Sequence, residues 1–177
     1  MTTTTFGPDN GEITLRTGVT GKASRTGHRL TIGFTDWSAS VDVEAPSLVD
    51  VRVGVDSLQI VSGEGGLTPM SAAERGVARS NALKSLKADD FGEITFVSTS
   101  VTADGDGYRI DGTLTLAGKS HEHSVVVAPV GTGADRHVVG ETTVSHSDFG
   151  IKQYSAMMGA LKVADEVTVR LDLVVPE

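Results

Sequence analysis

Two histidines separated by a single residue, His121 and His123, are the first side chains of this sequence whose types and spacing could do chemistry. On a β-strand both imidazoles lie on the same face, as the ligands of a zinc site would. Zinc sites use three or four ligands, however, and no recognisable third ligand stands at a fixed spacing from the pair. A zinc site and a solvated rim are both open interpretations. The missing third ligand favours the rim, and we expect no metal.

Residues 145–148, with the sequence SHSD, bring together the residue types of a hydrolytic triad. A triad is defined by its arrangement in space, which adjacency along the chain does not provide. The G-x-S-x-G turn of hydrolases, the G-x-G-x-x-G fingerprint and the P-loop pattern are all absent from the sequence. Asp104, Asp106 and Asp111 fit a hairpin turn better than a calcium loop, which needs a fuller set of ligands. We therefore expect no catalytic residues and no cofactor.

The segment 154–161, with the sequence YSAMMGAL, is apolar where a surface turn would usually contain Asn, Asp or Pro. Met is unbranched and polarizable, so it packs against ligands of varied shape. Tyr combines an apolar ring with a hydroxyl that can meet a polar head group. Together with Phe149 and Ile151, the segment is interpreted as lining or covering the mouth of a cavity. The alternative is ordinary core packing under a long loop.

The length of 177 residues suits one domain, 1–177, of which we expect residues 1–10 to be a flexible N-terminal arm. The chain contains no Cys, which excludes disulfides and thiolate metal sites. Its 15 Lys and Arg stand against 23 Asp and Glu, a formal net charge of −8. This charge opposes binding to nucleic acid and to anionic membrane surfaces, so both are set aside.

The N-terminal residues, MTTTTFGPDNGE, lack the basic start and the apolar run of a signal peptide. No apolar stretch is long enough to cross a bilayer, so no stable membrane insertion is expected. We expect a cytoplasmic location, unless a leader sequence has been removed.

Alternation of apolar and polar residues with a period of two is the dominant pattern of the chain. Residues 30–34 have one apolar face, and the alternation then continues from Trp37 with its phase shifted by one residue. Such a shift flips the faces of a strand unless a bulge absorbs it, so we predict a bulge near Thr35–Asp36. A second shift, between residues 49–55 and 58–60, predicts another bend of the same kind. Further strands are expected at residues 94–101, 108–116, 123–130, 137–144 and 167–175.

One segment, residues 67–90, has a helical pattern instead. Thr68–Pro69 is expected to open it, since proline suits the first helical turn. Ser71 and Glu74 have the spacing of a capping box. A break is expected near Asn81, because helix propensity is low there.

Many strands with one helix predict a mainly β fold, an antiparallel barrel of about eight strands with the helical segment covering an opening. Barrels of this size are either filled by side chains or hold one small ligand. Small residues expected to face inward, among them Gly33 and Ala39, favour a hollow interior. The only Trp, Trp37, is either a wall of that cavity or a structural core residue.

Five segments in order carry a resemblance to a known family: GHRLTIGFTDWSASVDV, VDVRVGVDSLQIVSGEGGLTPMSAAER, LKADDFGEITFVSTSV, YRIDGTLTLAGKS and SDFGIKQYSAMMGALKVADEV. They resemble the YceI-like family of lipid- and polyisoprenoid-binding proteins, and most closely its intracellular actinobacterial branch. The resemblance extends from about Gly27 to Leu173. The sequence departs from the family at Gly92 and Gln153, where Pro is usual, and in the polar segment 117–123.

The resemblance implies a lipocalin-like, extended barrel whose hydrophobic pore holds an isoprenoid-type amphiphile, tail inward. It also implies a possible homodimer, and it carries over no catalytic residues. The expected function is non-enzymatic binding or carriage of an apolar or amphiphilic ligand, an isoprenoid lipid or a quinone. The residues expected to contact this ligand are Phe34, Trp37, Phe96, Leu114, Phe149, Tyr154, Met157, Met158 and Leu161.

Two other functions stay open. An enzyme acting on a small apolar substrate would place converging polar groups with shifted pKa values in the same cavity. A ligand-free interaction or stress-related scaffold would have an interior filled by its own side chains. A continuous cavity of about 300 to 1,000 Å³, lined by carbon, would favour the carrier.

Overall fold

The computed structural model of the protein describes residues 3–42 and 48–175. Within these ranges the chain forms fourteen strands, one α-helix, α1 (Ala72–Ser85), and six short 3-10 helices. The strands are β1 (Thr3–Phe6), β2 (Gly11–Arg16), β3 (Val19–Thr20), β4 (His28–Phe34), β5 (Trp37–Asp42), β6 (Val49–Gly54), β7 (Leu58–Gly65), β8 (Glu93–Asp104), β9 (Gly107–Leu116), β10 (Lys119–Val130), β11 (His137–Ser145), β12 (Ser155–Ala156), β13 (Leu161–Val163) and β14 (Glu166–Val174). The 3-10 helices are η1 (Pro8–Asn10), η2 (Ser24–Thr26), η3 (Val55–Ser57), η4 (Gly133–Asp135), η5 (His146–Phe149) and η6 (Met157–Gly159).

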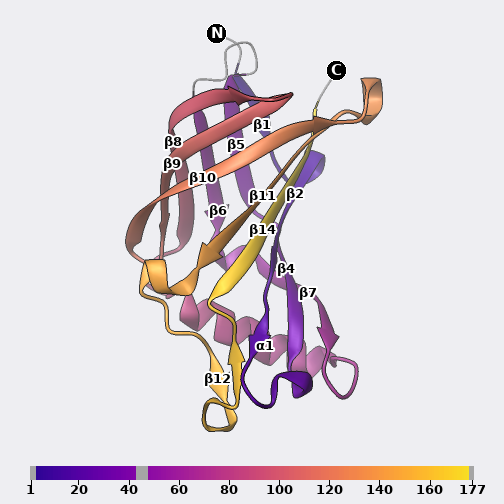
Figure 1. Ribbon diagram of the computed structural model, residues 1–177, viewed down its shortest axis with the longest axis vertical. Coiled ribbons are helices and arrows are strands. Elements are labelled where there is room, and N and C mark those ends of the chain that lie inside the picture. The colour runs from indigo at the N-terminus through magenta and orange to yellow at the C-terminus, as the bar shows by residue number, and fades with distance from the viewer. Residues whose placement is uncertain (1–2, 43–47, 176–177) are drawn as a thin grey trace.

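Eleven strands form one antiparallel sheet in the order β1-β5-β6-β8-β9-β10-β11-β14-β2-β4-β7. One end of this order holds β1, β5 and β6, and the other end holds β2, β4 and β7. The six strands belong to three chain segments, each divided by a bend into two strands: β1 and β2, β4 and β5, and β6 and β7. Each segment has one strand at each end of the order. Because the same segments lie at both ends of the order, the sheet curls around on itself, and the long strands in Figure 1 follow this curl.

The predicted class, a mainly β antiparallel barrel type with one helix, is confirmed. The number of strands differs from the expected eight, because the large sheet contains eleven and a second sheet, in the order β12-β13-β3, contains three. Counting each of the three interrupted segments as one run does leave eight runs in the large sheet. The sequence therefore predicted the runs, and the bends divide three of them.

The bend between β4 and β5 lies at Thr35–Asp36, where the phase shift predicted a bulge. It faces η3, which separates β6 from β7. The backbone N–H of Gly54 donates to the carbonyl of Asp36 at 2.9 Å. A Cβ on Gly54 would lie 2.6 Å from Asp36 Oδ2, so a larger residue here would require the Asp36 side chain to move.

Two clusters of buried side chains fill most of the curled sheet. The first surrounds Trp37 and consists of Phe6, Ile32, Phe34, Trp37, Ala39, Val53, Leu58 and Leu173. The second surrounds Phe149 and consists of Val49, Phe96, Ile110, Leu114, Leu116, Ala117, Val127 and Phe149. Phe149 is only 1% exposed, which makes it one of the best-buried large side chains of the chain.

Residues 3–6, within the segment 1–10 that the sequence predicted to be a flexible arm, form a strand. Thr3–Phe6 is a strand that pairs with β5, from Thr3 opposite Asp42 to Phe6 opposite Ala39. The side chain of Phe6 is 4% exposed and belongs to the first cluster, so burial of one aromatic ring fixes the segment. Residues 1–2 lie outside the described residues.

Helix α1 begins with the predicted capping box. The backbone N–H of Glu74 donates to Ser71 Oγ at 3.1 Å, and the N–H of Ser71 donates to Glu74 Oε1 at 3.3 Å. The predicted break near Asn81 is absent, and Pro69 precedes the helix instead of lying in its first turn. A low-propensity residue costs less than about 1 kcal/mol. Arg79 offsets such a cost by donating to the carbonyls of Leu58 and Asp56 at 2.8 and 2.7 Å, which ties the helix to the sheet.

The helix and the three-stranded sheet lie at the same end of the molecule, away from the two termini (Figure 1). At this end the bent strands β2, β4 and β7 extend beyond the filled part of the barrel. The fold therefore has a packed half and a half that α1 and the small sheet enclose.

The burial of Phe149 gives a stability test. We expect Phe149→Ala to lower the free energy of unfolding by about 3–5 kcal/mol, because it removes a buried ring and leaves a cavity. Phe91, which is 40% exposed, supplies a matched control, and Phe91→Ala should cost less than half as much. Urea unfolding followed by circular dichroism measures both values. Equal losses from the two variants would contradict the central place of Phe149.

Candidate functional site

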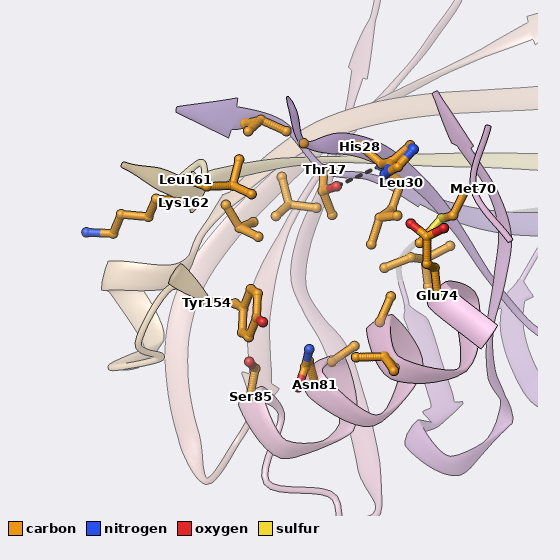
Figure 2. A pocket seen from close by; sticks show the side chains of 18 of the residues that line it. Thr17, His28, Leu30, Met70, Glu74, Asn81, Ser85, Tyr154, Leu161 and Lys162 are labelled. Carbon is orange, nitrogen blue, oxygen red and sulfur yellow. Dashed lines mark hydrogen bonds between the residues drawn. The ribbon is translucent and has the colours of Figure 1, made fainter. Parts of the chain in front are cut away.

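A cavity of about 740 Å³ lies between α1, the bent strands β2, β4 and β7, and the small sheet. Figure 2 shows Thr17 and Leu30 on one side of it and Asn81 and Ser85 of α1 on the opposite side. Most of its surface is carbon. The apolar side chains that line it include Leu15, Leu30, Ile32, Leu58, Leu67, Met70, Val77, Leu86, Ile151 and Val167.

Strand alternation provides the wall opposite the helix. Leu15 of β2 lies opposite Ile32 of β4 in the sheet register, and Leu30 shares the face of Ile32. The same face continues past the cavity into the first core cluster through Ile32. One apolar face of β4 thus lines the cavity near the beginning of the strand and packs into the first core cluster near the end of the strand.

The floor is a stripe of α1. Ala73, Val77, Asn81 and Ser85 recur every four residues, so they share one helix face, and all four line the cavity. Two of the four are small or apolar and two are polar. The helix therefore offers hydrogen-bonding groups on one stretch of an otherwise apolar enclosure.

At the edge of the cavity, β4 contacts the loop between β7 and α1. His28 Nε2 lies 2.9 Å from the carbonyl oxygen of Thr68. The N–H of Leu30 donates to Thr17 Oγ1 at 2.9 Å. Met70 packs directly on Gly63, where a Cβ would come within 2.3 Å of the Met70 sulfur. The His28 and Met70 contacts hold the loop that leads into α1 against β4 and β7, and the Leu30 hydrogen bond joins β4 to the segment after β2.

The small sheet closes the other flank. Tyr154, Leu161 and Val163 line the cavity there, and Gln153 Nε2 donates to the carbonyl of Val163 at 2.9 Å, which fixes the segment before β12. Figure 2 shows the Tyr154 ring between this sheet and α1. The ammonium group of Lys162 points away from the cavity in the same view.

Glu74 and His146, which line the cavity, and Asp165, which contacts His146, are engaged in structural hydrogen bonds. The backbone N–H of Ser71 is the largest cause of a lowered pKa at Glu74, and the Ser71 hydroxyl adds to it. His146 Nδ1 lies 2.7 Å from the carbonyl oxygen of Asp165. The hydroxyl and the N–H of Ser147 donate to the Asp165 carboxylate at 2.8 and 2.9 Å and lower its pKa. Both carboxylates are thereby held in their ionised form as caps.

The structure separates the residues predicted to contact a ligand. Tyr154 and Leu161 line the cavity. Phe34 and Trp37 lie in the first core cluster, and Phe96, Leu114 and Phe149 lie in the second. Met157 and Met158 are at the tip between β12 and β13, with 61% and 106% of full exposure.

The residues predicted to contact the ligand include none from β2 or α1 and only Phe34 from β4, although these elements line most of the cavity. The helical segment was expected to cover an opening, and its Met70, Val77 and Leu86 do line the cavity. Alternation did identify the inward face of residues 30–34, but it does not tell which part of that face meets a cavity and which part meets a core. The four-residue spacing of Ala73, Val77, Asn81 and Ser85 was a usable signal. It was hidden because two of these residues are polar.

The histidine pair and the SHSD run form neither a metal site nor a triad among the described residues. His123 Nε2 lies 2.9 Å from Thr142 Oγ1, and burial is the main cause of its lowered pKa. His121 Nε2 lies 3.9 Å from Asp148 Oδ1. Residues 3–42 and 48–175 contain no group of three or more His, Cys, Asp or Glu placed to hold a metal ion.

Within the same described ranges, no helix has both the length and the apolar character required to span a membrane.

Known proteins resemble this chain in sequence and in fold. The YceI-like domain family model matches residues 8–175. A UPF0312 protein of Shewanella sp. strain MR-4 is 31% identical over 167 residues, covering 89% of this chain and 79% of that protein, and a relative from strain ANA-3 has the same identity and coverage.

Two solved structures share the fold. Burkholderia cenocepacia BcnA superposes with a TM-score of 0.68 at 18% identity, over 94% of this chain and 96% of that one. The Campylobacter jejuni YCEI protein superposes with a TM-score of 0.62 at 17% identity, over 82% and 84%. The family match covers nearly every residue that builds the barrel wall, the helix and the cavity. The chain belongs to the YceI-like domain family.

Proposed function

We propose that this protein binds one apolar or amphiphilic molecule, an isoprenoid lipid or a quinone, in the cavity between α1 and the bent strands and carries it without chemical change. The observation that supports this proposal most directly is the cavity itself. Its volume of about 740 Å³ falls within the range of about 300–1,000 Å³ that ligand pockets usually have. Its lining is mainly aliphatic, which suits a hydrocarbon tail.

The energetics of such binding need no special chemistry. A prenyl tail of about fifteen carbons would contribute roughly 12 kcal/mol, at about 0.8 kcal/mol for each buried CH₂. Association costs at least about 4 kcal/mol in lost freedom. The net gain is therefore at most about 8 kcal/mol, which corresponds to micromolar affinity. Burial of the tail alone reaches this affinity when the association cost is at the low end of its range.

Polar groups at the edges of the cavity would orient the ligand. Asn81 and Ser85 form a polar stretch on α1, and the Tyr154 ring stands beside them (Figure 2). An amide, a hydroxyl and a phenol can hydrogen-bond a hydroxyl or carbonyl head group. The ionisable groups Glu74 and His146 already serve the helix cap and the β13–β14 turn, which favours a binder over an enzyme.

Three finer expectations belong to the same proposal. We infer a cytoplasmic location, a possible homodimer and a place in the intracellular actinobacterial branch of the family. The relatives described above come from Shewanella, so they lend no support to the last of these.

The length of the ligand tail should control affinity. Across geraniol, farnesol and geranylgeraniol we expect the dissociation constant to fall as the tail grows and to level off once the cavity is full. The binding free energy should improve by up to several kcal/mol per isoprene unit before ordering costs. Isothermal titration calorimetry measures the series. Native mass spectrometry and solvent extraction of the purified protein should also recover a prenyl compound. Affinity that does not depend on tail length, together with repeatedly empty preparations, would refute the proposal.

Filling the cavity should abolish binding. Val77 lines the cavity from α1, so Val77→Trp places an indole inside it, and we expect at least a tenfold loss of farnesol affinity. The neighbouring Gly76 has no atom within 4 Å of a built Cβ and does not line the cavity. Gly76→Trp is therefore the matched control, and it should keep wild-type affinity. Equal affinity in both variants would place the ligand elsewhere.

A further inference from the structure

The tip between β12 and β13 exposes two consecutive methionines. Met157 and Met158 have 61% and 106% of full exposure, and no buried cluster includes them. Both adopt positive φ angles, 54° and 57°, in the left-handed region that non-glycine residues seldom occupy. Such conformations persist where the surrounding structure enforces them, and they gather at functional sites. Here they hold two long apolar side chains outward at the end of a hairpin.

Basic residues surround this tip without acidic neighbours in the sequence. The segments 13–35 and 149–164 together contain six of the chain's 15 Lys and Arg and none of its 23 Asp and Glu. This composition contrasts with the net charge of −8 for the whole chain. The acidic character therefore belongs to the rest of the molecule.

Backbone contacts bring the two basic segments together at the tip. Lys162 of β13 pairs with Thr20 of β3. The N–H of Ala23 donates to the carbonyl of Ala160 at 2.8 Å, which places Lys22 beside the hairpin. Lys22 and Arg25 are exposed, and neither forms an ion pair with any described residue. Lys162 also directs its ammonium group outward (Figure 2).

This apolar, basic surface adjoins the mouth of the cavity. Tyr154 and Leu161, on either side of the Met157–Met158 tip, both line the cavity. Leu67, on the loop that leads into α1, is 79% exposed and lines it as well. A surface that contacts the tip would therefore stand next to residues of the cavity wall.

We propose that Met157, Met158, Lys22, Arg25 and Lys162 form a docking surface for an anionic phospholipid bilayer. The two methionine side chains enter the interfacial region, and the basic groups meet lipid phosphates. Docking would let a hydrophobic tail pass from the bilayer into the cavity. This consequence rests on the proposed function, whereas the docking itself does not.

Charge complementarity selects the bilayer as the partner. Each Lys or Arg close to an anionic membrane surface raises affinity about fivefold. Acidic groups farther than a Debye length, about 8–10 Å at physiological salt, are largely screened, so the negative remainder of the chain does not prevent docking. Two methionines that protrude from the end of one hairpin suit shallow insertion into a bilayer better than a broad protein interface, which needs a buried core.

Vesicle flotation with the full chain tests the docking surface. We expect the wild-type protein to float with phosphatidylcholine vesicles that contain phosphatidylglycerol, to stay behind with phosphatidylcholine alone, and to be released near 1 M salt, where the Debye length is about 3 Å. Met157→Asn/Met158→Asn, whose new residues tolerate positive φ, should lower vesicle affinity at least tenfold. Lys22→Gln/Arg25→Gln should lower it about 25-fold.

Matched controls lie at the other end of the molecule. Arg136→Gln removes an exposed charge and Val130→Thr removes an exposed apolar surface there, and both should bind vesicles like the wild type. Farnesol affinity in solution should be unchanged in all four variants, because none of the substituted residues lines the cavity.

The outcomes separate the two proposals. Vesicle binding without farnesol binding would leave the docking surface standing and refute the carrier. Farnesol binding without preferential flotation on anionic vesicles, or tip variants that float like the wild type, would overturn the docking surface alone. Self-association that Met157→Asn/Met158→Asn abolishes, with no flotation, would assign the tip to a second copy of the chain and equally overturn bilayer docking.

Discussion

The bend that three chain segments make at one level of the barrel is the constraint on which the rest of the structure depends. At this level β1 runs into β2, β4 into β5 and β6 into β7, and a close backbone approach between Asp36 and Gly54 holds two of the bends together. On one side of the bend the inward face meets Trp37 and its neighbours and is packed solid. On the other side the same segments diverge from the closed wall and leave apolar side chains without partners from the sheet.

Helix α1 and the small sheet cover the apolar surface that the bend leaves open. The helix is docked through Arg79 to carbonyl groups beside η3, so its position depends directly on the bend. Its cavity-facing stripe consists of Ala, Val, Asn and Ser, which are too small to fill the space above them. A helix with Leu or Phe at these positions would complete the core. The cavity therefore results from where the helix sits and from the small size of the residues it presents.

Charge, like packing, differs between parts of the molecule. The net charge of the chain is negative, yet the segments that build β3, η2, β12 and β13 contain only basic ionisable residues besides His28 and Tyr154. The side of the cavity built from β3, η2, β12 and β13 thus differs from the remainder of the chain in the sign of its charge, whereas Glu74 lines the side built from α1. Because electrostatic interactions in salt solution act over roughly 10 Å, this local composition governs what approaches the cavity.

The sequence by itself determined the strands, the phase shift at Thr35–Asp36, the capping box at Ser71 and Glu74, and the family. These features depend on neighbours within a few residues or on ordered segments, and both are visible along the chain. It did not predict the strand at residues 3–6, because burial of Phe6 needs a pocket built from residues far away in sequence. Nor did it reveal that Tyr154 and Leu161 line a cavity while Phe34 and Phe96 fill the core.

Tertiary structure alone decided that division. Period-two alternation states which face of a strand points inward, but the distance to the opposite wall depends on bends and on the placement of α1, which are properties of the assembled chain. The same holds for Met157 and Met158, which are apolar enough for a core yet lie at a tip with nothing packed over them within the described residues. Apolar character predicts that a side chain avoids water, and only the fold determines what it meets instead.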